Sequence, residues 1–359
     1  MVKNKVNDFL PYHLNVNDIN KYFVEMGSHT KASQAAIHSF QETERNHSLS
    51  KFCFSAVTKE DVKSAMNDIK SRAVGSDQIS IQMIKAVSPY ALGAITYLIN
   101  ESLASGVFPQ DWKMSIVRPI PKVTAPKSVH QLRPISILPA ASKLLEKIVT
   151  RQIENFLNEE NILPKMQSGF RKGHSTCTAL VNLFSDLLDA KDKGKFSTLV
   201  MLDFSQAFDS IDYSMLMAKM HFYGFGEKAI KWVRSYLEDR KQITRLASET
   251  SIPLIKKRGV PQGSCLGPLL FNLYTSDFPS CVQGCTAHLY ADDCQLHLSY
   301  EPGSAEESIT KINSDLSNIC TWSVNNGLQL NIGKCSVIHL APHNVVQPLI
   351  DRDVVVRIG

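Results

Sequence analysis

Three aspartates stand among apolar residues in two distant segments. Asp203 lies near the end of the apolar run TLVMLDF (198–204), and Asp292 and Asp293 interrupt the apolar segment AHLYADDCQLHL (287–298). A buried carboxylate is costly unless a cation neutralises it, and Mg²⁺ takes hard oxygen ligands. Two such ions about 4 Å apart can activate a hydroxyl nucleophile and stabilise a phosphate leaving group. The three aspartates therefore predict a site for two Mg²⁺ ions, which Mn²⁺ can replace; the alternative is a strand cap and a polar turn.

Glycines and basic residues elsewhere in the chain are suited to binding phosphate groups. The segment GVPQGSCLGP (259–268) carries small residues that allow close backbone approach, and a helix after it would offer free N–H groups to a phosphate or a base. Arg133, Arg171 and Lys172 lie beside predicted turns and suit phosphate recognition, with solvated surface charges as the alternative. Lys334 could act as a general acid, or be a solvated turn lysine.

The elements that must position these residues alternate between helices and strands. Thr58 and Asp61 have capping-box spacing, Pro89 is expected to open a second helix, and SIVRPIPK (115–122) is typical of an edge strand because proline cannot donate to a ladder. Further helices are expected from the apolar spacing around 145–156, 179–187, 215–221, 227–239 and 309–319, and hairpins at 287–298 and 327–340. Ser304 and Glu307 form a second capping-box pattern. Together these elements predict an α+β fold, a sheet layered by helices.

Length and composition permit a large core and exclude several classes. The chain has 359 residues, of which 43% are hydrophobic, and its net charge of +5 allows a nucleic-acid partner without demanding one. The eight cysteines include no CxxC pair; Cys281 and Cys285 could begin a zinc site, but no second pair follows. The start lacks a signal peptide, and no run of 18 apolar residues occurs. We therefore expect an intracellular protein of the nucleus or cytoplasm, neither secreted nor bound to a membrane.

Seven motifs in order resemble the reverse transcriptases of non-LTR retrotransposons, the long-interspersed-element type. Together they extend over roughly residues 58–340. The motifs are FPQDWKMSIVRPIPK (108–122), LRPISILPAASKLLEKIV (132–149), QSGFRKGHST (167–176), LDFSQAFDSID (202–212), RGVPQGSCLGPLLFNLY (258–274), YADD (290–293) and LQLNIGKC (328–335).

The resemblance implies a right-hand polymerase fold with an antiparallel palm sheet backed by helices. Residues 1–57 are weakly patterned and rich in Asn, His and Ser, and are interpreted as an extension or linker. The resemblance places the polymerase domain at 58–359, with fingers at about 58–195, a palm at about 196–340 and a truncated tail at 341–359. The helical thumb of the family is expected to be absent, so the chain resembles a truncated or degenerate copy with low activity.

The resemblance also implies an activity and residue roles. The activity is RNA-directed DNA synthesis, with an RNA template, a DNA primer and deoxynucleoside triphosphates as partners. Asp203, Asp292 and Asp293 match the metal-binding carboxylates, and Lys334 the lysine of the last palm motif. Arg133, Phe208, Gln262 and Gly263 match nucleotide-binding positions, with Phe208 as a steric gate against the ribose 2′-hydroxyl or else a core residue; Arg171 and Lys172 match template contacts.

Three further points remain open at this stage. Asp209 and Asp212 are interpreted as N-caps or turn residues, not metal ligands. A catalytically silent, nucleic-acid-binding relic is one alternative function. An RNA-dependent RNA polymerase is another, and the aromatic Phe208 speaks against it because RNA synthesis must admit the 2′-hydroxyl.

Overall fold

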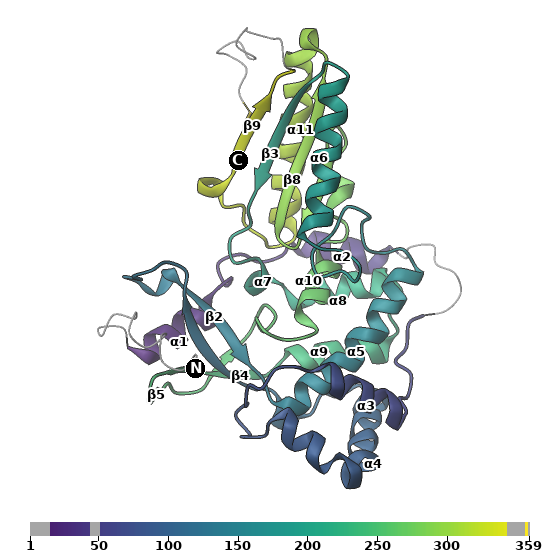
Figure 1. Cartoon of the computed structure of the whole chain (residues 1–359), viewed down its shortest axis with the longest axis vertical. Coiled ribbons are helices and arrows are strands. Elements are labelled where there is room, and N and C mark those ends of the chain that lie inside the picture. Colours follow the sequence, from purple (N-terminus) through teal and green to yellow (C-terminus); the bar gives the residue numbers. More distant parts are fainter. Residues whose placement is uncertain (1–14, 44–50, 343–355, 358–359) are drawn as a thin grey trace. The chain divides into compact units, whose positions relative to one another are not determined.

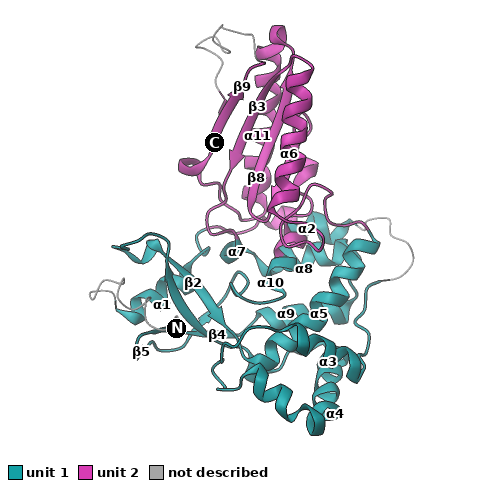
Figure 2. Ribbon diagram, in the orientation of Figure 1, with its two compact units in different colours: residues 1–29, 37–160, 208–270 teal, residues 30–36, 161–207, 271–359 magenta. Residues whose placement is uncertain are grey.

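The computed structural model describes residues 15–43, 51–342 and 356–357, and the chain divides into two compact units (Figure 2). Unit 1 comprises Met1–His29, Ile37–Glu160 and Phe208–Leu270; unit 2 comprises Thr30–Ala36, Asn161–Ala207 and Phe271–Gly359. Within the described ranges, no helix combines the length and the apolar character needed to cross a lipid bilayer.

The sheet of unit 1 has the strand order β2-β1-β4-β5, with β6 also pairing with β4. Strand β1 is antiparallel to β2 and parallel to β4. The strands are β1 (Met114–Pro121), β2 (Leu132–Ile137), β4 (Arg240–Leu246), β5 (Glu249–Thr250) and β6 (Leu254–Lys256).

The predicted edge position of β1 is wrong for its first half. Met114 to Val117 pair with β4 and Ile116 to Pro121 pair with β2, so Ile116 and Val117 lie between two neighbouring strands. Arg118 to Pro121, which include both prolines, pair with β2 alone. The prolines therefore limit the pairing locally, where a ladder N–H is missing, and do not move the whole strand to the edge.

Several helices of unit 1 follow the sequence pattern. They are α3 (Lys59–Asp68), α4 (Ile81–Ser105), α5 (Ala140–Glu159), α8 (Tyr213–Phe222) and α9 (Glu227–Leu237), while the short α7 (Ala207–Ser210) and α10 (Gly267–Tyr274) lie where the two units meet in the sequence. The predicted capping box of Thr58 and Asp61 is confirmed. The predicted start of α4 at Pro89 is wrong: Ser80 caps the helix, and Pro89 lies inside it. The Ser88 hydroxyl donates 2.8 Å to the Lys85 carbonyl, the group that an N–H at position 89 would have reached.

Two helices occupy the stretch interpreted as an extension, α1 (Val16–Glu25) and α2 (Gln34–Glu42). Helix α1 packs against β4 and β6. Its fully buried Asn20 donates 2.9 Å to the Ile252 carbonyl and accepts from Gln242 and Thr244 at 3.0 Å each. This polar hub makes α1 a part of unit 1. The helical spacing of the buried residues Val16, Ile19 and Phe23 was the available signal for this helix.

The sheet of unit 2 has the order β7-β8-β3-β9, and every neighbouring pair is antiparallel. Its strands are β7 (Thr286–Tyr290), β8 (Asp293–Tyr300), β3 (Phe196–Leu202) and β9 (Ser336–Leu340). Helices α6 (Thr176–Asp192) and α11 (Ala305–Asn325) pack against it and run alongside its strands in Figure 1. Mixed helices and strands agree with the predicted α+β class; the division into fingers and palm stays a prediction.

The cap of α11 differs from the prediction. Ser304 is at the N-cap position, but its hydroxyl donates 3.2 Å to the Glu301 carbonyl and caps no helix N–H. Glu307 pairs instead with Lys311, one turn later on the exposed face. A short 3-10 turn, Pro302–Ser304, precedes the helix and turns the serine away from the capping geometry.

Candidate active site

Strand pairing brings Asp203 and Asp293 together in unit 2. Leu202 at the end of β3 pairs with Cys294 on β8, so the residues one step further, Asp203 and Asp293, stand opposite each other. Asp293 begins β8, and Tyr290 is its partner across the hairpin. Ala291 and Asp292 form the two-residue turn between β7 and β8, and the φ angle of Ala291, 57°, is left-handed. The predicted hairpin is confirmed.

Asp203 and Asp293 repel each other electrostatically. Partial loss of water raises the pKa of the Asp293 carboxyl, the Asp203 charge raises it further, and Lys334 opposes both effects. Asp203 Oδ2 is buried and has no hydrogen-bond donor among the described residues. Lys334 Nζ lies 3.3 Å away, close enough for an ion pair but without hydrogen-bond geometry. An oxygen without a donor beside a second carboxylate is a set of atoms that fits a divalent cation.

The three predicted carboxylates are not assembled around one point. Among the described residues, no three acidic, histidine or cysteine side chains lie close enough to share one metal ion. The structure therefore pairs Asp203 with Asp293, and Asp292 remains a predicted ligand.

Lys334 is placed by a segment that runs along β3. Asn331 N–H donates 2.8 Å to the Asp203 carbonyl, and Leu330 bridges Phe204. A 3-10 turn, Ile332–Lys334, follows, and β9 then continues along β3. The predicted hairpin at 327–340 is wrong, because β9 pairs with β3 and Leu330 bridges Phe204 just after β3, so the two predicted arms do not pair with each other. The Lys334 side chain remains 66% exposed, so it can reorient.

A neutral scaffold holds the turn that carries Asp292. Buried Gln167 accepts from the Ala291 N–H at 3.0 Å and from the Gly169 N–H at 2.8 Å. A Cβ on Gly169 would lie 2.1 Å from the Ala291 nitrogen, so only glycine fits. Asn272 donates 2.8 Å to the Gly169 carbonyl and fixes the segment from its other side.

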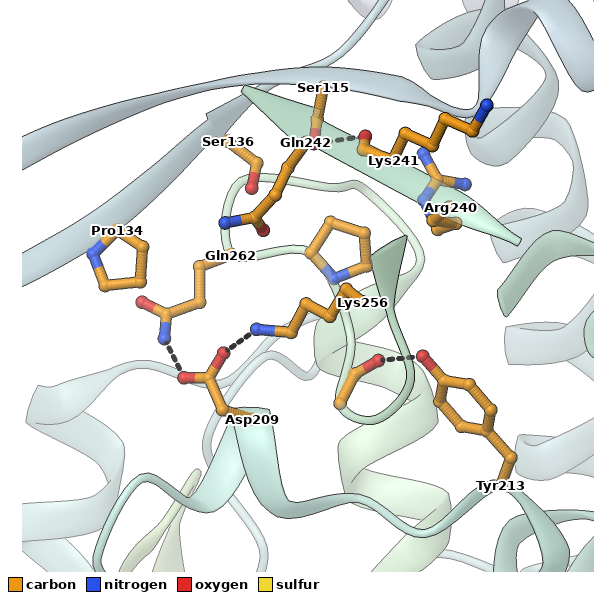
Figure 3. Close-up of a pocket in the computed structure, with 12 residues that line it drawn as sticks. Ser115, Pro134, Ser136, Asp209, Tyr213, Arg240, Lys241, Gln242, Lys256 and Gln262 are labelled. Carbon is orange, nitrogen blue, oxygen red and sulfur yellow. Dashed lines mark hydrogen bonds and ion pairs between the residues drawn. The ribbon is translucent and has the colours of Figure 1, made fainter. Parts of the chain in front are cut away.

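The loop 256–266 of unit 1 carries Gln262 and is fixed by its neighbours. Val260 N–H donates 2.9 Å to the Phe208 carbonyl, and Ser136 N–H donates 2.7 Å to the Gln262 carbonyl. A Cβ on Gly263 would meet the Ser136 carbonyl oxygen at 2.6 Å, and the φ of Gly263 is 114°. The loop encloses a small cavity (Figure 3). The residues that line it are Ser115, Pro134, Ser136, Asp209, Tyr213, Arg240, Lys241, Gln242, Lys256, Gly259, Pro261 and Gln262.

Residues 120–349 match the family described as reverse transcriptase (RNA-dependent DNA polymerase). The chain belongs to this family. It is 32% identical over 265 residues, 70% of its length, to the Drosophila melanogaster protein "Probable RNA-directed DNA polymerase from transposon BS". It is 29% identical over 290 residues, 78% of its length, to the Drosophila funebris protein "RNA-directed DNA polymerase from mobile element jockey". The matched regions are 28% and 31% of those relatives, so the chain spans about a third of their length or less. The predicted resemblance to the non-LTR reverse transcriptases is confirmed.

The predicted nucleotide-binding residues of this reverse transcriptase occupy different faces of unit 1. Gln262 lines the cavity. Arg133 is exposed and alternates along β2 with Pro134, which lines the cavity, so the arginine lies on the opposite face of the strand. Phe208 is half-buried, and Gly263 is exposed next to Gln262. Their roles in nucleotide binding remain predictions.

The predicted template contacts lie in the loop that follows the turn scaffold. Arg171 donates 2.9 Å to the Pro164 carbonyl, which ties its guanidinium to the loop. Lys172 is exposed. Both residues stay predictions as template contacts.

The two aspartates interpreted as caps behave differently. Asp212 caps α8 by accepting from the Ser214 N–H at 3.0 Å, as predicted. Asp209 caps nothing: it is 1% exposed, and its carboxylate binds the side chains of Lys256 and Gln262. The cap prediction for Asp209 is wrong, because the loop 256–266 packs over this residue and supplies other partners for its carboxylate.

Sequence reasoning also missed Glu146, which holds the end of the same loop. It is fully buried on α5 and accepts from the Cys265 N–H at 2.8 Å and from the Ser142 hydroxyl at 2.8 Å. Burial raises its pKa, and the positive charge of Arg240 opposes the rise. A glutamate among apolar helical positions was the available signal, since such a residue must find donors. For Gln167 the sequence held no comparable sign.

Proposed function

We propose that the chain is the polymerase domain of an RNA-directed DNA polymerase from a non-LTR retrotransposon. The supporting observation is the register of β3 and β8, which sets Asp203 opposite Asp293, together with a buried Asp203 oxygen that accepts no hydrogen bond from the described part of the chain. The relatives named as RNA-directed DNA polymerases, and the family match, support the same reaction class. In this proposal the fingers span about residues 58–195 and the palm about residues 196–340, a range that includes the whole sheet of unit 2.

Asp203, Asp292 and Asp293 would hold two Mg²⁺ ions, or Mn²⁺ ions, at the strand ends. When bound, the ions supply Lewis-acid activation of a primer hydroxyl and neutralise charge on the departing pyrophosphate. The protein's own part is to keep the Asp203 and Asp293 carboxylates adjacent, which the antiparallel ladder does. Lys334 offers a proton donor next to Asp203 and can give a proton to the departing pyrophosphate.

The remaining predicted residues select and orient the substrates. Phe208 is the steric gate that rejects a ribose 2′-hydroxyl, and Gln262 with Gly263 lies beside the incoming deoxynucleoside triphosphate. Arg133 reaches the triphosphate from the exposed face of β2. Arg171 and Lys172 contact the RNA template, and such phosphate contacts position the strand without reading its sequence.

Primer extension tests the proposal. The chain is given a DNA primer on an RNA template, with Mg²⁺ and either deoxynucleotides or ribonucleotides. We expect incorporation of deoxynucleotides, and a Phe208→Ala variant should raise ribonucleotide use relative to deoxynucleotide use. Loss of product on chelating the metal is the control. A folded chain that incorporates neither nucleotide, or that prefers ribonucleotides, would contradict the proposal.

A further inference from the structure

The carboxylate of Asp209 joins two side chains at the base of the cavity (Figure 3). Lys256 Nζ pairs with Oδ1, and Gln262 Nε2 donates 2.6 Å to Oδ2. The Asp209 side chain is 1% exposed and that of Lys256 12% exposed, so the pair is largely removed from water. A buried charge pair is costly to break, since one charge would then remain without a partner.

Two glycines clamp the backbone of Asp209. A Cβ on Gly27 would lie 2.3 Å from the Asp209 carbonyl oxygen, and a Cβ on Gly259 would lie 2.5 Å from the Asp209 Cα. Both glycines have left-handed φ angles, 74° and 73°, which other residues rarely adopt. Asp209 therefore cannot move away from the loop without displacing chain on two sides.

The charge of Asp209 decides which way the Gln262 amide faces. An ionised carboxylate only accepts hydrogen bonds, whereas the amide has a donor end and an acceptor end. The NH₂ group must therefore face Asp209, and Figure 3 shows the amide oxygen pointing away from it. No other described side chain or backbone group hydrogen-bonds this amide, so its oxygen and second N–H remain available for a ligand.

We propose that Asp209 is a positioning residue that fixes the Gln262 amide in one orientation for the incoming deoxynucleotide, with Lys256 compensating its charge. This inference rests on the proposed function, because it takes the nucleotide as the ligand of Gln262. An asparagine at position 209 could offer Gln262 either a donor or an acceptor. The amide would then lose its fixed orientation, although the volume at position 209 would barely change.

The test is a double-mutant cycle on nucleotide binding. Wild type, Asp209→Asn, Gln262→Ala and the double variant are each bound to a primer–template whose primer lacks a 3′-hydroxyl, so that binding needs no turnover. The Kd of the matched deoxynucleotide is then measured with Mg²⁺. We expect each single variant to raise this Kd about tenfold, the loss of one charge-assisted hydrogen bond. The double variant should bind no more weakly than Gln262→Ala, since Asp209 acts only through Gln262.

Asp111→Asn is the control, because it changes an exposed aspartate of unit 1 that lies outside the loop 256–266. It should leave both the melting temperature and the nucleotide Kd nearly unchanged. If Asp209→Asn does not fold, Asp209→Asn/Lys256→Gln removes both charges together and should show the same tenfold rise in Kd. Circular dichroism and thermal melting decide which variant is used.

The outcomes separate this inference from the proposed function. If the Asp209→Asn and Gln262→Ala effects multiply, or if Asp209→Asn changes only the melting temperature, Asp209 does not act through Gln262 and the inference fails alone. A folded wild-type chain that binds no deoxynucleotide in this complex would overturn both. If the Asp203→Asn variant extends the primer at the wild-type rate, the metal assignment is refuted. The comparison of nucleotide Kd values is unaffected by that result.

Discussion

The turn at 290–293 and the loop at 256–266 are both held rigidly, but by opposite chemistry. The turn in unit 2 rests on the neutral amide of Gln167 and on Gly169. The loop in unit 1 rests on two buried carboxylates, Asp209 and Glu146.

The charge that each segment presents explains the difference. The turn presents carboxylates: partial loss of water and then the Asp203 charge raise the pKa of Asp293, and a further carboxylate beneath the turn would add to the repulsion. The loop presents backbone N–H groups and an amide NH₂ group, all of which are donors. An ionised carboxylate accepts hydrogen bonds from such donors more strongly than a neutral oxygen does. In both places the support is the electrostatic complement of the group that it positions.

The largest expected effect comes from removing the support of the loop. Glu146→Ala should lower the free energy of unfolding by about 2–4 kcal/mol, because it leaves the Cys265 N–H and the Ser142 hydroxyl buried without an acceptor. Chemical denaturation measures it. Glu154→Ala, on the same helix without a described hydrogen bond or ion pair, should change the stability by less than about 0.5 kcal/mol. Equal losses for the two variants would show that Glu146 does not hold the loop.

Exchanging the chemistry of the turn tests the comparison directly. Gln167→Glu puts a carboxylate under Asp292 and Asp293, where the turn now rests on an amide. In the absence of Mg²⁺ we expect Gln167→Glu to lower the free energy of unfolding by about 1–3 kcal/mol, because the added charge increases the repulsion among the carboxylates. Gln283→Glu adds the same charge at an exposed position of unit 2 and should have little effect. If the two variants behave alike, the neutrality of position 167 is irrelevant.

The smallest effect concerns stability without metal. Asp293→Asn removes one of two repelling carboxylates, so in the absence of Mg²⁺ it should melt slightly above wild type at neutral pH. The pKa of Asp293 is raised in the folded chain, which means that its charge penalty exists above that pKa and disappears as the pH falls through it. The difference in melting temperature should therefore close on acidification. A difference that grows at low pH would show that Asp203 and Asp293 do not repel.

The sequence predicted the parts of the site that lie on single segments. The apolar run ending at Asp203 and the alternation around Asp292 and Asp293 predict two strands and a hairpin, because burial on one sheet imposes those patterns. The family resemblance added the roles of Gln262 and Phe208, which no local pattern contains.

The supports of the site could not be read from the sequence. Gln167 lies 124 positions from Ala291, and Glu146 lies 119 positions from Cys265, so each contact depends on tertiary packing. Asp209 has the local appearance of a helix cap, and only the packing of residues 256–262 over it gives it another partner. The prediction at Pro89 was wrong for a local reason, because the hydroxyl of the preceding Ser88 satisfies the carbonyl that the proline leaves open.

One measurement tests the central claim, that the carboxylates at the strand ends carry RNA-directed DNA synthesis. Single-turnover extension of a DNA primer on an RNA template is compared for wild type, Asp203→Asn and Asp189→Asn, an exposed aspartate on α6. All three should fold with similar melting temperatures. Asp203→Asn should slow extension about a hundredfold or more, the rate equivalent of several kcal/mol of lost metal binding and charge stabilisation, while Asp189→Asn extends like wild type. A folded Asp203→Asn chain that extends the primer at the wild-type rate would contradict the claim.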